Sequence, residues 1–193
     1  MRRVCVFCGS SPGRDPRYAE AARALARGLV SRGVGVVFGG GSVGLMGVLA
    51  DQVLAVGGSV VGVIPHGLAA RELAHRGVAD MRVVATMHAR KTLMADLADG
   101  FVALPGGLGT FEELFEVATW GQLGIHRKPI GILNVAGYYD PLVALLDHAV
   151  AEGFVSPANR GLLRVDGDPV CLIDRMVAHE PPPAPSWITP QEA

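Results

Sequence analysis

Six short apolar runs, rich in valine and isoleucine, alternate along this chain with longer segments of helical character. The runs span residues 3–9, 33–40, 58–65, 81–86, 100–107 and 128–135, and most of them end in glycine or proline. Near-continuous apolar strands of this kind are typical of a parallel sheet covered on both faces. The helix-like segments span residues 17–33, 45–58, 87–99, 110–124 and 138–153. Repeated strand–helix units predict an α/β fold, a doubly wound and mostly parallel sheet with helices on both faces. In such a fold, ligands bind at the carboxyl ends of the strands.

The size and charge of the chain limit the classes of protein it can be. Its 193 residues, 50% of them apolar, can form one sizeable core. We expect a single domain over residues 1–180, followed by a proline-rich, mobile tail over residues 181–193. A formal net charge of −1 offers no electrostatic attraction to nucleic acid or to an anionic membrane. No signal sequence or membrane-spanning run is visible, so we expect a cytoplasmic protein.

The cysteines and histidines are the candidate metal ligands and redox groups. Cys5 and Cys8 form a C-x-x-C pattern, which occurs in zinc and redox sites. The chain offers no second pair of ligands at a recognisable spacing, and residues three apart on a strand point to opposite faces. We therefore interpret both cysteines as buried strand residues, and we expect neither a metal nor a cofactor.

The first glycine-rich loop lies between a predicted strand and a predicted helix. Gly39, Gly41 and Gly44 have the G-x-G-x-x-G spacing of a dinucleotide site. The acidic residue expected at the end of the next strand is absent, because that strand ends in Ile-Pro-His, and a Walker lysine is absent as well. These absences disfavour NAD and a P-loop. Two interpretations stay open: the glycines allow tight strand–helix packing, or they line a nucleotide pocket.

The second glycine-rich loop, LPGGLGT at residues 104–110, leads directly into a predicted amphipathic helix. Thr110 and Glu113 have the spacing of a capping box, with Thr110 as the N-cap and Glu113 as the third helical residue. Capping and packing alone would explain the motif. The alternative is an anion site, because the first amides of a helix have no partner and the helix dipole favours negative charge.

Arg90 and Lys91 lie near the start of the helix predicted over residues 87–99. Basic side chains in such a place are commonly part of a solvated helix face. Cations near a helix N-terminus oppose its dipole, however, so a facing anion is the alternative.

Several motifs of the chain together resemble one known family. PGGLGTFEE matches the PGGxGTxxE signature of the LOG family, the cytokinin riboside 5′-monophosphate phosphoribohydrolases, and MHARK matches the MHxRK motif paired with it. GGGSVGLMG, the run from ATWGQLG to GYYDPLV, and AVAEGFVSP follow in the order and rough spacing of that family. The similarity covers residues 4–163 and favours the shorter, dimeric members.

The resemblance implies hydrolysis of the N-glycosidic bond in N6-substituted adenosine 5′-monophosphates and in AMP, giving free base and ribose 5-phosphate. It implies a modified Rossmann fold, a small-molecule nucleotide as partner, no cofactor, and a homodimer. The catalytic residues that it implies are Arg90 and Glu113. The substrate-binding residues that it implies are Glu72, Arg90, Lys91, Gly107, Leu108, Gly109, Thr110, Phe111, Glu112, Glu113 and Thr119.

This reaction explains why an acidic residue would lie next to a phosphate-binding loop. A phosphate on the loop amides would leave the sugar near the first turn of the helix, whose pitch is about 5.4 Å. Bond cleavage develops positive charge on that sugar, and the Glu113 carboxylate would stabilise the charge or orient the attacking water. We expect the helix N-terminus to lower the pKa of Glu113 and keep it ionised at neutral pH.

Two other classes of protein stay open. A binding protein of similar fold would carry a nucleotide or a molybdenum cofactor without turning it over, and the joint presence of Arg90 and Glu113 favours the enzyme. A PLP-dependent decarboxylase needs a Schiff-base lysine with aromatic and acidic partners. The two lysines of the chain, Lys91 and Lys128, do not have such a context.

Overall fold

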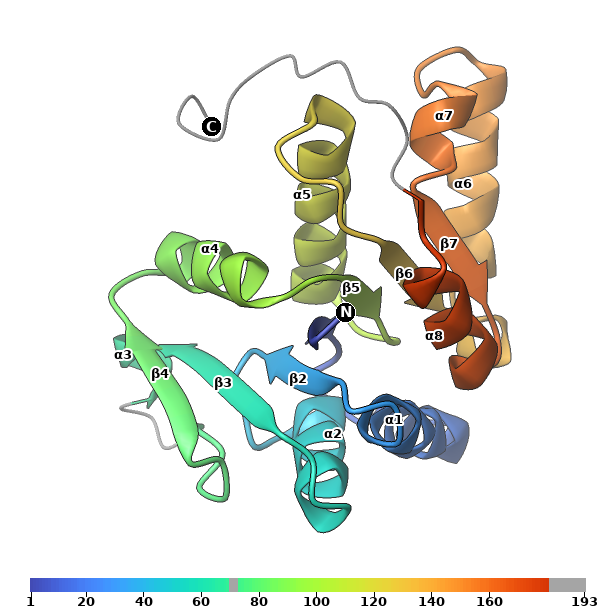
Figure 1. Ribbon diagram of the computed structural model, residues 1–193. Coiled ribbons are helices and arrows are strands. Elements are labelled where there is room, and N and C mark those ends of the chain that lie inside the picture. Colours follow the sequence, from blue (N-terminus) through green and yellow to red (C-terminus); the bar gives the residue numbers. More distant parts are fainter. Residues whose placement is uncertain (70–72, 181–193) are drawn as a thin grey trace.

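The computed structural model describes residues 1–69 and 73–180 and shows there one parallel sheet of seven strands (Figure 1). The strands lie in the order β4-β3-β2-β1-β5-β6-β7, and each neighbouring pair is parallel. They are β1 (Arg3–Phe7), β2 (Gly35–Phe38), β3 (Val60–Pro65), β4 (Asp80–Val84), β5 (Phe101–Ala103), β6 (Ile130–Leu133) and β7 (Leu163–Asp166). The α/β fold with a parallel sheet is confirmed, as are the six strands predicted from the apolar runs.

Helices cover both faces of the sheet. They are α1 (Pro16–Val30), α2 (Gly44–Ala55), α3 (His66–Ala69), α4 (Met87–Leu97), α5 (Leu108–Leu123), α6 (Asp140–Ala151), α7 (Pro157–Arg160) and α8 (Pro169–Val177), with a 3-10 turn η1 (Val135–Gly137). In Figure 1, α1, α2 and α8 lie on one face, while α4 and α5 lie on the other. Each face has its own core of buried apolar side chains. The doubly wound arrangement follows from these two layers.

Strand β1 lies at the point where the strand order reverses. The chain builds outward from β1 to β4 and then crosses back to place β5 on the other side of β1. The loops that follow β1 and β5 therefore diverge, and a crevice opens between them at the carboxyl end of the sheet. A ligand site was predicted at this end of the strands.

The two cysteines of the C-x-x-C pattern are buried on opposite sides of the sheet. Cys5, on β1, belongs to the core beneath α4 and α5, whereas Cys8 belongs to the core beneath α1 and α2. This confirms that both cysteines are buried, with Cys5 on the central strand β1 and Cys8 directly after its last residue.

The last strand and helix were not predicted from the apolar pattern. β7 is an edge strand of four residues, LRVD, of which only the first is buried, so it has no continuous apolar run. Helix α8 buries Leu172, Ile173 and Met176, and all three belong to the core beneath α1 and α2. The predicted tail at residues 181–193 lies outside the described residues. None of the described helices is long and apolar enough to cross a membrane.

Candidate active site

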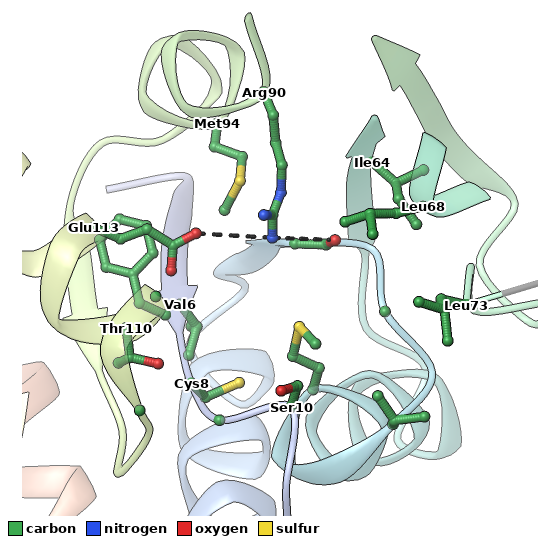
Figure 2. A pocket seen from close by; sticks show the side chains of 18 of the residues that line it. Val6, Cys8, Ser10, Ile64, Leu68, Leu73, Arg90, Met94, Thr110 and Glu113 are labelled. Carbon is green, nitrogen blue, oxygen red and sulfur yellow. Dashed lines mark hydrogen bonds and ion pairs between the residues drawn. The ribbon is translucent and has the colours of Figure 1, made fainter. Parts of the chain in front are cut away.

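A cavity of about 370 Å³ opens at the carboxyl end of the sheet, where the strand order reverses (Figure 2). Its walls come from β1 and the loop after it, the loop after β2 and the start of α2, the end of β3 with α3, and helices α4 and α5. The residues that line it are Val6, Phe7, Cys8, Gly9, Ser10, Gly39, Gly41, Val43, Met46, Ile64, Leu68, Leu73, Arg90, Met94, Gly107, Leu108, Gly109, Thr110 and Glu113.

Three polar or charged side chains are buried in the described part of the chain: Arg90, Thr110 and Glu113. All three line this cavity. Burying a charge is costly unless it is paired, so charged groups that stay buried are commonly retained for function. This coincidence makes the cavity the candidate active site.

Helix α5 begins on the wall of the cavity and exposes its first amides there. Its N-cap is Gly107, and no side chain caps the helix. Gly107, Leu108 and Gly109 are exposed, so solvent reaches this end of the helix. Unpaired amides at the positive end of a helix dipole form a binding site for an anion such as a phosphate.

The predicted capping box is wrong. Helix α5 begins at Leu108, so Thr110 is its third residue instead of its N-cap, and Glu113 is its sixth residue instead of its third. The chain enters the helix earlier than predicted because Gly107 itself serves as the cap. Glu113 is therefore free from a capping role. It lies about 6 Å along the helix axis from the amide of Gly109, at 1.5 Å per residue.

Arg90 and Glu113 face each other across the cavity. Figure 2 shows the Arg90 side chain extending from α4 into the cavity and the Glu113 carboxylate pointing toward it from α5. Arg90 Nη2 lies 3.7 Å from Glu113 Oε1, which is an ion pair without a hydrogen bond. No residue of the described chain donates a hydrogen bond to this carboxylate. Its oxygens are thus available to a ligand or a water molecule.

Two backbone carbonyls hold the guanidinium of Arg90 in this position. Arg90 Nε donates a hydrogen bond to the carbonyl of Val63 on β3 at 3.2 Å, and Nη2 donates to the carbonyl of Gly39 after β2 at 3.3 Å. Val63 lies within β3 and Gly39 directly follows β2, and both strands are buried throughout, so they are rigid supports. The guanidinium is therefore fixed by the sheet, with one edge left toward Glu113.

Burial raises the pKa of Glu113 to about 7, and the nearby Arg90 offsets this only in part. The expected lowering by the helix N-terminus is wrong. The carboxylate is one turn further along the helix than predicted, and desolvation is the larger effect there. Glu113 consequently changes its charge near neutral pH.

Cys8 also lines the cavity, but it is a poor nucleophile. Burial raises the pKa of its thiol well above the ordinary value, and the Glu113 carboxylate raises it further. The thiolate is the reactive form of cysteine, so this side chain stays inert at neutral pH.

The structure places only some of the predicted site residues in the cavity. Arg90, Gly107, Leu108, Gly109, Thr110 and Glu113 line it, whereas Lys91, Phe111, Glu112 and Thr119 do not. Phe111 packs against the core beneath α5, and the Thr119 hydroxyl donates to the carbonyl of Phe115 at 2.8 Å. Glu72 lies outside the described residues.

Lys91 does not line the cavity and instead joins α4 to α5. Its Nζ donates to Glu112 Oε1 at 2.5 Å and to Glu116 Oε1 at 2.8 Å. Burial alone would disfavour the charged ammonium, but the hydrogen bonds to the two carboxylates outweigh burial and raise the pKa of Lys91. The side chain is therefore a charged contact between the two helices.

The apolar part of the cavity was missed by the sequence interpretation. Leu68, Leu73, Ile64, Met46 and Met94 supply it (Figure 2). Ile64 lies near the carboxyl end of β3, Leu68 lies on α3 just beyond it, and Met46 lies on α2 after β2. The fold class predicts ligand contacts in this region. Their positions relative to those strands were the signal that could have identified them. Gly39 and Gly41 line the cavity, which favours the second interpretation of the first glycine-rich loop.

The described residues contain no group of three or more histidine, cysteine, aspartate or glutamate side chains that could hold a metal ion. The charged residues that line the cavity within the described chain are Arg90 and Glu113 alone. The chemistry of this site therefore centres on one guanidinium, one carboxylate and the amides of α5.

Comparison with known proteins agrees on one family. Residues 46–176 match a family model described as "Possible lysine decarboxylase". The chain is 53% identical over 183 residues to a "Probable cytokinin riboside 5'-monophosphate phosphoribohydrolase" of Oryza sativa subsp. japonica, covering 95% of this chain and 74% of the relative. It is 51% identical over 181 residues to a cytokinin riboside 5'-monophosphate phosphoribohydrolase of Arabidopsis thaliana, covering 94% of this chain and 83% of the relative.

Solved structures share the fold at much lower identity. The molybdenum cofactor carrier protein of Chlamydomonas reinhardtii superposes with a TM-score of 0.69 at 19% identity, over 93% of this chain and 99% of that chain. The molybdenum cofactor binding protein of Rippkaea orientalis gives 0.69 at 18% identity, over 92% and 99%. At this identity the likeness concerns the fold alone. The family model and the curated relatives show that the chain belongs to the LOG family, the family of the cytokinin riboside 5'-monophosphate phosphoribohydrolases.

Proposed function

We propose that this protein hydrolyses the N-glycosidic bond of N6-substituted adenosine 5′-monophosphates, and of AMP, to free base and ribose 5-phosphate. The observation that carries the proposal is the arrangement of the α5 amides beside the buried Arg90–Glu113 pair. An anion cradle and a carboxylate about one helical turn apart match the two parts of a nucleotide that such a reaction must hold. The names of the curated relatives support the same reaction.

The α5 amides would hold the 5′-phosphate. Leu108, Gly109 and Thr110 follow the uncapped N-cap residue, and their amides face the cavity without a competing side chain. Phosphate binding at this point fixes the nucleotide and brings its sugar close to Glu113, one turn along the helix. A nucleoside without the phosphate would lose this positioning.

Glu113 would serve the sugar during cleavage. The bond between the base and C1′ breaks, positive charge develops on the sugar ring, and a water molecule adds to C1′ while a proton goes to the leaving base. An ionised Glu113 stabilises that charge or orients the water. Because burial raises its pKa to about 7, the carboxylate is ionised above neutral pH and poorly solvated, which strengthens its interaction with a cation.

Arg90 would contact the substrate with the edge of its guanidinium that the two backbone carbonyls leave open. Its charge also balances that of Glu113 in the buried site. A fixed cation of this kind requires no reorganisation when the substrate binds, which is the condition for electrostatic stabilisation.

The apolar part of the cavity supports an apolar substituent on the base. Leu68 and Leu73 lie with Ile64 on the side opposite Glu113 in Figure 2. Side chains of this type offer hydrophobic contact rather than hydrogen bonds, as an N6-alkyl or isoprenoid group would require.

The lysines of the chain do not support a decarboxylase. Lys91 Nζ is hydrogen-bonded to Glu112 and Glu116, and Lys128 Nζ donates to the carbonyl of Ala95 at 2.8 Å. Neither residue lines the cavity. A Schiff base would need a lysine there.

The experiment that tests the proposal incubates the purified protein with AMP and with isopentenyladenosine 5′-monophosphate. Chromatography then follows release of the free base and of ribose 5-phosphate. The proposal expects both products in equal amounts from at least one nucleotide. Tight binding of either nucleotide without product would instead make the protein a carrier.

We also propose that the protein is a cytoplasmic homodimer. Met87, Leu108 and Phe115 leave apolar surface exposed on α4 and α5, and α6 has no buried residue among its twelve. Exposed apolar surface on these helices supports association of two copies. Sedimentation at micromolar concentration tests it, and a monomer would contradict it.

A further inference from the structure

We propose that Gly39 is a positioning residue for Arg90, because only a residue without a side chain leaves room for the guanidinium against the end of β2. The inference rests on the proposed function, since it gives the first glycine-rich loop a part in assembling the catalytic pair. It gives this glycine a role that does not require a dinucleotide site, which the sequence already disfavoured.

A side chain at position 39 would collide with Arg90. A Cβ atom built on Gly39 would lie 1.8 Å from Arg90 Nη2 and 3.0 Å from Arg90 Cζ. The same Nη2 donates its hydrogen bond to the carbonyl of Gly39 and faces Glu113. The guanidinium is therefore supported by the backbone carbonyl of Gly39 and also occupies the space that a side chain at position 39 would need.

The backbone at Gly39 does not itself require glycine. Gly40 and Gly44, in the same loop, have φ values of 74° and 61°, which explains those two glycines by conformation. Gly39 is absent from the positive-φ glycines. Space for Arg90 is thus the reason that remains for glycine at position 39.

The neighbouring Gly41 makes the contrast clear. A Cβ atom there would meet the terminal Cε of Met46 at 2.6 Å, a flexible apolar group that can turn aside. At Gly39 the group that must turn aside is the charged end of Arg90. The fold can accommodate that movement, because the moving atoms are the far end of a side chain. The movement would, however, take the guanidinium away from Glu113.

The inference predicts a separation of activity from stability in Gly39→Ala. The guanidinium would leave the carbonyls of Val63 and Gly39, and kcat/KM for isopentenyladenosine 5′-monophosphate should fall about 10²-fold, the cost of misplacing a catalytic group by about 1 Å. The thermal midpoint should stay within about 4 °C of the unmodified protein. Gly167→Ala is the matched control, since its Cβ meets only the Asn134 carbonyl oxygen at 3.6 Å, and it should leave both quantities unchanged.

A double-mutant cycle tests whether Gly39 acts through Arg90. We would measure Gly39→Ala, Arg90→Ala and the double variant under the same conditions. If Gly39 acts only by positioning Arg90, the alanine at position 39 should cost nothing further once Arg90 is removed. If the two losses multiply, Gly39 acts on the substrate or the loop by itself, and the inference is overturned.

The pH dependence gives a second readout. Displacement of Arg90 from Glu113 should move the acid limb of kcat/KM to higher pH, because a cation near the carboxylate is lost. The other titratable groups around Glu113 are Lys91 from α4, Cys5 on β1, Cys8 directly after β1, and Glu112 and Glu116 on its own helix. None of them is touched by this substitution, so an unmoved limb would contradict the displacement.

The outcomes distinguish this inference from the proposed function. If the unmodified protein releases no base, or Arg90→Ala keeps full activity, the proposed function or its assignment of Arg90 fails. If Arg90→Ala is inactive but Gly39→Ala is fully active, only the positioning inference fails. If Gly39→Ala does not fold, the double variant decides: recovery of folding on removal of Arg90 supports the inference, and continued misfolding overturns it.

Discussion

Two groups of charged side chains connect α4 to α5, and they start from neighbouring residues on each helix. Arg90 and Glu113 face the cavity with 3.7 Å between their charged atoms. Lys91, the next residue on α4, does not line the cavity and makes direct hydrogen bonds with Glu112 and Glu116. The charged atoms of the first group are too far apart for a hydrogen bond, and both side chains are buried. The second group is joined by short hydrogen bonds and is partly exposed, with the Glu112 side chain 54% exposed.

The difference between the two groups indicates what each one does. Lys91 donates one hydrogen bond to each of two carboxylates, which holds the helices together and leaves its ammonium engaged within the protein. Arg90 is held by backbone carbonyls instead, so its attraction to Glu113 is incomplete and the Glu113 pKa stays raised to about 7. Incomplete pairing in a buried site costs stability and keeps both groups available to a substrate.

The sharpest way to break this comparison is Glu113→Gln. Loss of the charge should reduce turnover on the order of 10²–10⁴-fold, because neutral glutamine can neither stabilise the sugar cation nor activate water. The thermal midpoint at pH 8 should stay within about 4 °C, since removal of a desolvated carboxylate offsets the lost attraction to Arg90. The matched control is Glu112→Gln, whose carboxylate lies outside the cavity. Near-normal turnover in a folded Glu113→Gln would leave Glu113 without a catalytic part.

Arg90→Ala should have the next largest effect. It removes the one cation that lines the cavity within the described chain, and turnover should fall on the order of 10²–10³-fold. The variant also leaves Glu113 without its partner, so circular dichroism and the thermal midpoint are needed beside the rate. A loss of activity that only follows unfolding would argue against direct contact with the substrate.

The pH dependence of kcat/KM should show whether Glu113, in the group that is not hydrogen-bonded, takes part in the reaction. If Glu113 acts as the ionised group, kcat/KM should fall about tenfold per pH unit below pH 7 and level off above it. Glu113 affects the stability of the fold in the opposite sense. Because the pKa of Glu113 is higher in the folded protein than in the unfolded chain, its contribution to the free energy of unfolding is fully present below pH 4.5. That contribution is lost as the pH rises through 7. A limb near 7 that persists in Glu113→Gln would belong to another group, such as the substrate phosphate.

Lys91→Met should have the smallest effect on rate and a visible effect on stability. It removes two charge-assisted hydrogen bonds between α4 and α5, so the thermal midpoint should fall by about 2–8 °C. Turnover at pH 8 should change less than tenfold. The family resemblance assigns Lys91 to substrate binding, and a KM raised 10²-fold with the midpoint unchanged would favour that assignment instead.

Much of the fold was predictable because it depends on continuous apolar runs. Strands β1, β2, β3, β5 and β6 are buried along almost their whole length, and each stands out as an apolar run. β4 lies at an edge of the sheet and has no buried residue, but it was predictable because its run MRVVAT is still apolar. β7 was not predicted, because an edge strand buries only Leu163 and carries charged residues beside it.

The site was predictable where a motif carried it and unpredictable where tertiary contacts did. The resemblance pointed to Arg90 and Glu113, and the glycine-rich loop indicated the amides of α5. The raised pKa of Glu113 depends on how deeply the helix is packed, which spacing along the chain does not show. The same is true of Gly39, whose closeness to Arg90 joins residues 51 positions apart.

The central claim is that the α5 amides and the Arg90–Glu113 pair act on one molecule at once, the first on its phosphate and the second on its sugar. The direct measurement compares kcat/KM for isopentenyladenosine 5′-monophosphate with that for the same nucleoside without phosphate. The account predicts a large loss for the nucleoside, on the order of 10²-fold or more, because the sugar is no longer positioned at Glu113. Equal rates for the two compounds would contradict it.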